Sequence, residues 1–456
     1  MNLFSRMTAL GRYTLIGIAA VCGIALIGLI WIASDPGPTA FANGETVALA
    51  DYKGASPTGV PEKLAKASLI ARGRYLARAA DCAACHTAPG GKPFAGGLAI
   101  KTQFGTLYSP NITPDQKTGI GSFTDADFIK VLHQGVTRDG TRLYPAMPYA
   151  AYTYMTDADA LAIKAYLFSL APVHAVAPKN TLAFPYNQRW LMAIWQLLFN
   201  PDTRFAPNVG RSAEWNRGAY LSEAMAHCGD CHTPRNWLQA LDNRSKFSGA
   251  DAEGWRAYNI TDDEKTGIGA WHDAELAQYL STGHAIGHGT ASGTMGEAVD
   301  HSLSYLTPGD IKAIVAYVRT VPALPSSQLP ATSARPAPAS AQKGVPAGFD
   351  PLGKQVFEGV CASCHSWTGQ SALTPYATLT GARAVNDPSG INAAQIVISG
   401  MMLKTKHGMA TMPAFGAAYS DVEIAAVVNY VTARFGSKGS NIKAQDVAVL
   451  RGQTSQ

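Results

Sequence analysis

The pattern Cys-x-x-Cys-His occurs three times in this chain and limits its fold more than any other feature. The copies span residues 82–86, 228–232 and 361–365. Two thiols at this spacing lie one helical turn apart and can form thioether bonds to the two vinyl groups of one porphyrin. The histidine that follows at once can bind the iron as its proximal ligand. We therefore predict three covalently bound haem c groups.

A Cys-x-x-Cys pair can also be a redox-active dithiol or half of a zinc site. A histidine placed directly after the pair in all three copies argues against both alternatives. Six of the seven cysteines belong to the motifs, and the seventh, Cys22, lies in an apolar stretch, so no thiols remain for disulfides. Because haem c is attached outside the bacterial cytoplasm, we expect the motifs on that side of the membrane.

Residues 13–33 carry no charged side chain, and a stretch of about 20 such residues can cross a bilayer. Arg6 and Arg12 precede this stretch, so the positive-inside rule places the N-terminus in the cytoplasm and the haem domains on the periplasmic side. We interpret residues 1–34 as a membrane anchor or a signal segment. The Ala-Phe-Ala sequence at residues 40–42 resembles a cleavage site and keeps the second interpretation open.

A chain of 456 residues has room for about three domains, and a haem c domain is small because the porphyrin supplies much of its core. We predict an all-α fold of three tandem class I cytochrome c domains behind an N-terminal transmembrane helix. The expected domains span residues 66–172, 211–322 and 351–436. Seven prolines among alanines and serines in residues 322–351 predict a semi-extended tether before the third domain.

Internal similarity supports this division. Residues 111–121 (NITPDQKTGIG) closely match residues 259–269 (NITDDEKTGIG), and the third domain lacks this segment. Each domain ends in an apolar helix that begins with a hydroxyl residue followed three positions later by an acid, as in a capping box. These pairs are Thr156 and Asp159, Thr307 and Asp310, and Ser420 and Glu423. Ten residues beyond each cap stand Tyr166, Tyr317 and Tyr430, which we expect to face the helix that precedes the motif.

A methionine as the sixth iron ligand raises the reduction potential relative to a second histidine. The candidates between each motif and its closing helix are Met147, Met295 and Met412. Proline follows the first and the third of these and would stiffen an extended loop. Rival ligands are Met155 in the first domain, His284, His288 and His301 in the second, and Met401, Met402 and Met409 in the third. We interpret most histidines outside the motifs, His407 among them, as ordinary surface or core residues.

Residues 189–199 (RWLMAIWQLLF), between the first two domains, are too few to span a membrane and are apolar nearly all round. Such a helix must be buried or covered. One alternative is that it packs against the haem domains of this chain. The other is that it forms a docking surface for a partner or for the membrane interface.

The formal net charge of +5 is a mild excess, and no basic run with interleaved aromatic residues occurs, so we do not expect nucleic-acid binding. We find no nucleophile triad, P-loop or dinucleotide-binding fingerprint, and we predict no catalytic residues.

With these motifs the chain resembles the three-haem cytochrome c subunit of bacterial membrane-bound dehydrogenases for alcohols, gluconate and related polyols or aldehydes. The resemblance covers residues 66–436 and rests on the three motifs, the Tyr-Pro-Ala-Met-Pro sequence at 144–148 and the paired segments. In that family the cytochrome takes electrons from a catalytic subunit with pyrroloquinoline quinone, flavin or a molybdenum cofactor and passes them to ubiquinone. The resemblance implies haem attachment through Cys82, Cys85, Cys228, Cys231, Cys361 and Cys364, and iron ligation by His86, Met147, His232, Met295, His365 and Met412.

We therefore expect a subunit that transfers electrons from a periplasmic dehydrogenase subunit to ubiquinone in the cytoplasmic membrane, and that is not itself an enzyme. Two alternatives remain. A haem enzyme would need an open iron, and three methionine candidates argue against it. A freestanding, membrane-anchored shuttle to a terminal oxidase would need no catalytic partner.

Overall fold

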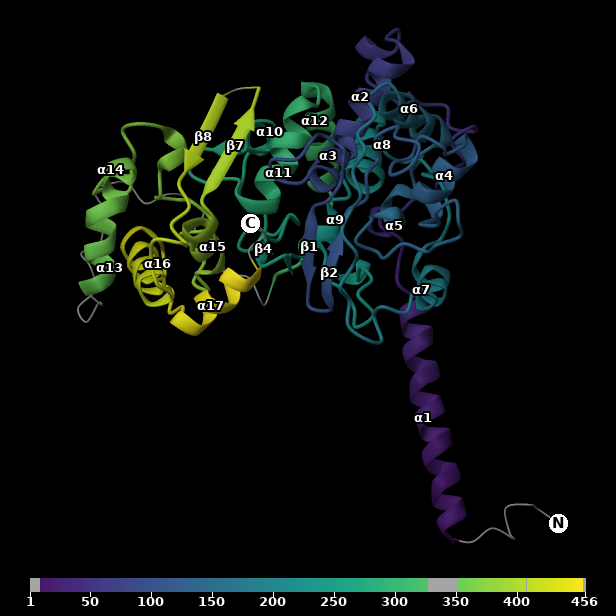
Figure 1. The fold of residues 1–456 in the computed structure, drawn as a ribbon, viewed down its shortest axis with the longest axis horizontal. Coiled ribbons are helices and arrows are strands. Elements are labelled where there is room, and N and C mark those ends of the chain that lie inside the picture. The colour runs from purple at the N-terminus through teal and green to yellow at the C-terminus, as the bar shows by residue number, and fades with distance from the viewer. Residues whose placement is uncertain (1–8, 327–350, 407, 454–456) are drawn as a thin grey trace, which may run out of the picture.

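The computed structural model describes residues 9–326, 351–406 and 408–453. Most of the expected proline-rich tether and His407 therefore lie outside the described residues. The chain forms one body of short helices, from which a single long helix projects (Figure 1). This helix is α1 (Ala9–Ala33), and its residues Tyr13–Ile32 are the one stretch among those described that is long and apolar enough to cross a membrane.

The body has three consecutive parts, each containing one motif. The first consists of α2 (Leu69–Ala79), α3 (Cys82–His86), β1 (Ala99–Thr102), β2 (Gly105–Tyr108), α4 (Asp125–Gln134), α5 (Tyr149–Tyr152) and α6 (Asp157–Phe168). Helix α7 (Leu191–Phe199) follows. The second consists of α8 (Ala213–Tyr220), α9 (Gly229–His232), β3 (Ala250–Ala252), β4 (Trp255–Ala257), α10 (Asp273–Thr282), β5 (His284–Ala285), β6 (Gly289–Thr290), α11 (Gly293–His301) and α12 (Pro308–Val318). The third consists of α13 (Pro351–Val356), α14 (Ala362–His365), α15 (Ile391–Ser399), β7 (Met401–Thr405), β8 (Gly408–Met412), α16 (Asp421–Phe435) and α17 (Ala444–Gln453).

Each part is built on a close crossing between the helix before its motif and its closing helix. The crossings pair α2 with α6, α8 with α12 and α13 with α16. At each crossing a glycine lies against a backbone carbonyl and the expected tyrosine, and any side chain there would overlap with the carbonyl oxygen. The contacts are Gly73 with Ala162 and Tyr166, Gly218 with Ala313 and Tyr317, and Gly353 with Ala426 and Tyr430. The expected packing of the three tyrosines is therefore confirmed.

The first two parts share one hydrophobic core and are linked by two reciprocal hydrogen bonds between side chains. The hydroxyl of Tyr75 on α2 donates to Asp310 at 2.5 Å, and the hydroxyl of Tyr220 on α8 donates to Asp159 at 2.5 Å. Each acid stands in the first turn of the other part's closing helix. Asp159 and Asp310 therefore accept hydrogen bonds that join the two parts. A full capping box forms at the start of α16.

The third part has a core of its own and packs against the second. The side chain of Asn392 on α15 exchanges two hydrogen bonds with the backbone of Arg256 on β4, at 2.8 and 2.9 Å. Leu403 on β7 is buried against Gly283 of the second part. In Figure 1 the hairpin of β7 and β8 stands between α14 and the helices of the second part.

The expectation of an all-α chain is correct for the larger elements but misses four two-stranded antiparallel hairpins. The pairs β1–β2 and β3–β4 occupy equivalent places in the first two parts, and β7–β8 belongs to the third. Strands of two to five residues carry too little alternation to be recognised from the sequence, because a period of two needs several repeats to stand out.

Candidate functional site

Each motif histidine is held by a hydrogen bond from its ring to a backbone carbonyl. The distances are 2.8 Å from His86 Nδ1 to the oxygen of Pro110, 2.7 Å from His232 Nδ1 to that of Tyr258, and 2.6 Å from His365 Nδ1 to that of Ala377. A carbonyl only accepts, so Nδ1 carries the proton and Nε2 keeps its lone pair. Burial lowers the pKa of all three histidines, which favours this neutral form. The neutral imidazole is the form that binds a metal.

Four of the motif thiols are not poised for redox chemistry. Burial raises the pKa of Cys82, Cys228 and Cys231 to about 12, and that of Cys361 to about 11. Redox-active dithiols need the thiolate, and their pKa values are lowered by nearby positive charge. The buried cysteines therefore favour a covalent attachment role over a dithiol role.

All three motifs open into one continuous cavity of about 3120 Å³. A pocket for one drug-sized ligand measures roughly 300–1,000 Å³, so this cavity has room for several large groups. Its lining includes the six motif cysteines and their histidines. It also includes Met147, Met295 and Met412. The residues present therefore fit large apolar groups with a metal centre.

The three predicted methionines come from three different local structures. Met147 lies in the turn that precedes α5, Met295 in the first turn of α11, and Met412 at the end of β8. Met412 is directly opposite Met401 on the paired strand β7. The expected extended backbone with a following proline is found at Met412, whereas Met147 lies in a turn and Met295 is helical.

The alternative sixth ligands differ in their contacts, in their exposure and in whether they line the cavity. His288 stacks on the ring of Trp271, and its Nε2 is 3.2 Å from a carboxylate oxygen of Glu275. His284 does not line the cavity, whereas His301 does. Met402 and Met409 also line the cavity, but their side chains are largely exposed. Met155 and Met401 line the cavity and remain the methionine rivals of Met147 and Met412 by position.

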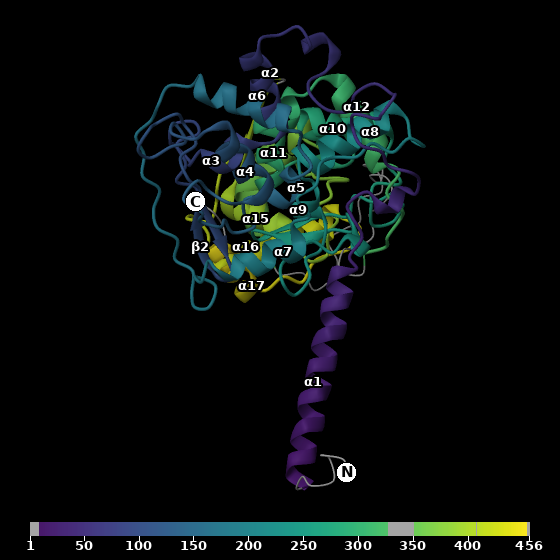
Figure 2. The ribbon, with the colours of Figure 1, turned by 90° about the vertical axis from the view of Figure 1, so that its right-hand side faces the viewer.

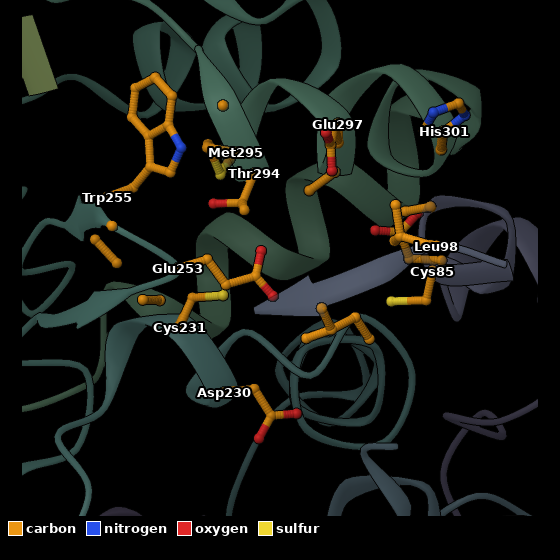
Figure 3. Close-up of a pocket in the computed structure, with 18 of the residues that line it drawn as sticks. Cys85, Leu98, Asp230, Cys231, Glu253, Trp255, Thr294, Met295, Glu297 and His301 are labelled. Carbon is orange, nitrogen blue, oxygen red and sulfur yellow. The ribbon is translucent and has the colours of Figure 1, made fainter. Parts of the chain in front are cut away.

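Two carboxylates that line the cavity could not be recognised from the sequence. Glu253, in the turn between β3 and β4, and Glu297 on α11 both line the cavity between the first and second motifs. Figure 3 shows the sulfur atoms of Cys85 and Cys231 directed into the same space as the Glu253 carboxylate. Burial, with Glu253 nearby, raises the pKa of Glu297 to about 7. Neither acid belongs to a recognisable motif, so only the tertiary structure places them at the cavity.

Tyr258 connects the second motif to the third part of the chain. Its carbonyl accepts the hydrogen bond from His232, while its hydroxyl donates to Asp387 at 3.2 Å. The guanidinium of Arg383 lies over its ring, 4.6 Å from the centroid. The first part has Pro110 in the equivalent place, which offers no such side chain. The backbone that orients His232 is therefore fixed by residues of the third part.

Comparison with known proteins places these features in context. A family model described as cytochrome c matches residues 70–171, and one described as cytochrome c oxidase, cbb3-type, subunit III matches residues 351–431.

Three curated relatives match most of the chain. The fructose dehydrogenase cytochrome subunit of Gluconobacter japonicus is 39% identical over 416 residues, which cover 87% of this chain and 85% of that protein. The gluconate 2-dehydrogenase cytochrome c subunit of Pantoea cypripedii is 39% identical over 400 residues, covering 84% and 90%. The cytochrome c subunit of the quinone alcohol dehydrogenase of Gluconobacter oxydans is 34% identical over 401 residues, covering 84% and 82%.

Proposed function

Because this chain belongs to the family of cytochrome c subunits of membrane dehydrogenases, we propose that it transfers electrons from a periplasmic dehydrogenase subunit, through three covalently bound haem c groups, to membrane ubiquinone. The single observation that carries the proposal is the set of three equivalent motif histidines. In each histidine, Nδ1 donates a hydrogen bond to a backbone carbonyl, and all three histidines line one cavity.

The haem sites are proposed residue by residue. Thioethers form at Cys82 and Cys85, Cys228 and Cys231, and Cys361 and Cys364. The iron ligands are His86 with Met147, His232 with Met295, and His365 with Met412. Bound haem iron supplies reversible one-electron redox chemistry, and a methionine ligand raises its potential. The protein contributes ring orientation through the backbone carbonyls and exclusion of water through burial. Each site belongs to one domain, over residues 66–172, 211–322 and 351–436.

The proposed electron donor is a separate catalytic subunit that carries pyrroloquinoline quinone, flavin or a molybdenum cofactor. Support comes from the relatives, which are named as cytochrome subunits of fructose, gluconate and alcohol dehydrogenases. At the candidate site of this chain, the described residues supply histidine, cysteine and methionine, which are the residues that attach and ligate haem c.

We place the protein in the bacterial cytoplasmic membrane, held by α1, with the body on the periplasmic side. The contacts after α1 support a retained anchor. Arg211 donates to the carbonyl of Ala42 at 2.5 Å, and Phe41 packs against Tyr317, with ring centroids 5.8 Å apart. Two residues that cleavage after Ala42 would remove therefore pack against the body.

The haem content gives the first prediction. We expect a pyridine haemochrome assay on purified protein to give about three haems per chain, because each motif supplies both thiols and the proximal imidazole. The haem should remain with the denatured chain on a gel. A value near one, or haem that acid acetone extracts, would contradict the proposal.

The electron route gives the second prediction. The purified chain should oxidise no alcohol, sugar acid or aldehyde by itself. With its catalytic subunit, it should support substrate-dependent reduction of a ubiquinone analogue, measured by the absorbance of the quinone. The catalytic subunit with an artificial dye serves as the control for substrate oxidation. Turnover of a substrate by the isolated chain would overturn the assignment.

A further inference from the structure

Helix α7 buries its hydrophilic side chain together with Trp195, and it exposes two of its large apolar side chains. Gln196 is the one hydrophilic side chain of the helix, and it is buried. Ile194 and Leu197 are 53% and 83% exposed, and Trp190, just before the helix, is 64% exposed. Ile194 and the nearby Trp237 also line the cavity, whereas Trp190 and Leu197 do not. The spacing of these three residues places them on one face. A helix in contact with water shows the opposite arrangement.

This orientation is fixed by hydrogen bonds on the inner face. Trp195 Nε1 donates to the carbonyl of Leu238 at 2.9 Å, and Gln196 Nε2 donates to that of Gly135 at 3.2 Å. Arg142 also donates to the Gln196 side chain. The helix therefore cannot roll to hide Ile194 and Leu197 without breaking buried hydrogen bonds. Of the two alternatives that the sequence left open, packing against the haem domains thus describes the inner face of α7, and a docking surface describes its outer face.

The same loop that holds α7 also holds the end of α1. Leu238 belongs to the loop that continues to Arg244, and Arg244 donates to the carbonyl of Trp31 at 2.6 Å. Arg244 also pairs with Asp35 at 3.0 Å, and its guanidinium lies 4.4 Å from the centroid of the Trp31 ring. Figures 1 and 2 both show α7 at the end of the body from which α1 projects. The outer face of α7 is therefore beside the point where α1 leaves the body.

Exposed tryptophans mark the same place. Four of the chain's eight tryptophans are exposed. Trp31 lies on α1, Trp190 lies just before α7, and Trp237 lies in the loop that contacts both helices, whereas Trp367 lies in the third part. Trp237 is 70% exposed. Tryptophan gathers at the membrane–water boundary because its ring is apolar and its N–H is polar.

We propose that the face formed by Trp190, Ile194, Leu197 and Trp237 lies in the interfacial layer of the bilayer that α1 enters. The proposal rests on the proposed function, in which α1 crosses that bilayer. Continuity with α1 and the tryptophans select lipid as the occupant, and an apolar face of this kind binds at the boundary between headgroups and acyl chains. Together the two contacts set the orientation of the body on the membrane.

Photocrosslinking from single positions tests this proposal. The full haem-containing chain is reconstituted in vesicles of phosphatidylethanolamine and phosphatidylglycerol. Benzoylphenylalanine replaces Leu197 in one variant, Leu26 on α1 in a second and Leu373 in a third. Leu373 is the matched control, because it is 72% exposed and belongs to the third part. Figure 1 shows helices α13 and α14 of that part on the opposite side of the body from α1. After illumination, lipid adducts on each peptide are measured by mass spectrometry.

We expect lipid adducts at positions 197 and 26, and at least tenfold fewer at position 373. Adducts at 26 but not at 197 would overturn the α7 contact and leave the anchor intact. Absence of adducts at both 26 and 197 would overturn the anchor and the α7 contact together. Equal adducts at 197 and 373 would show unspecific contact and overturn the proposal. Repeating the experiment with the catalytic subunit present adds a further outcome: a protein adduct at 197 in place of the lipid adduct assigns this face to that partner and overturns the proposal.

Discussion

The variant His232→Ala is expected to abolish quinone reduction by the dehydrogenase complex while leaving dye reduction by the catalytic subunit unchanged. The second part of the chain shares a core with the first and holds the third through Asn392 and Tyr258. A redox centre at His232 would therefore lie between the other two. Loss of this imidazole removes the proximal ligand of the middle redox centre, so electrons cannot pass between the other two centres. Ubiquinone-analogue reduction should fall to the background of the assay.

Two measurements keep this test sharp. The haem content of His232→Ala should fall from about three to about two, which shows that the first and third parts still mature. A matched variant, His174→Ala, removes a histidine whose side chain is 64% exposed and should leave quinone reduction unchanged. Full quinone reduction by His232→Ala with two haems would place the second centre outside the electron route.

The second large effect is expected from Met295→Ala. An oxidised haem with a methionine ligand shows a weak charge-transfer band in the far red. Because three sites are proposed, the variant should lose about a third of this band. The iron that loses its ligand should also bind carbon monoxide, which difference spectra of the reduced protein detect. Retention of the full band would instead favour His288 or His301 as the ligand, because both line the cavity and His284 does not.

Exposed methionines provide the control. Met402→Ala changes a methionine that lines the cavity but is largely exposed on β7, on the face opposite to that of the buried Leu403, and should leave the band and carbon monoxide binding unchanged. The same comparison separates Met412 from Met401, which face each other across β7 and β8. We expect Met412→Ala, and not Met401→Ala, to open the third iron.

The helix crossings show which tertiary contacts a sequence can reveal. The tyrosines at 166, 317 and 430 recur at one distance from a helix cap, and each packs where that regular spacing predicts. The caps themselves were predictable only in part. Thr156 and Thr307 accept the expected backbone hydrogen bonds, but Asp159 and Asp310 turn to tyrosines of the other part. A capping acid can bond to its own helix or to a neighbour, and only the neighbour's position decides between them.

The sequence by itself determined where the three Cys-x-x-Cys-His motifs lie, on which the haem proposal rests, and which two segments are repeats. These features depend on residues close together in the chain, so their chemistry is readable from spacing alone. Tertiary structure alone decided that three motifs share one cavity, that Glu253 and Glu297 enter it, and that α7 exposes its apolar face beside α1. Each of these depends on contacts between residues far apart in sequence, and helical periodicity gives the faces of a helix without giving the neighbours that cover them.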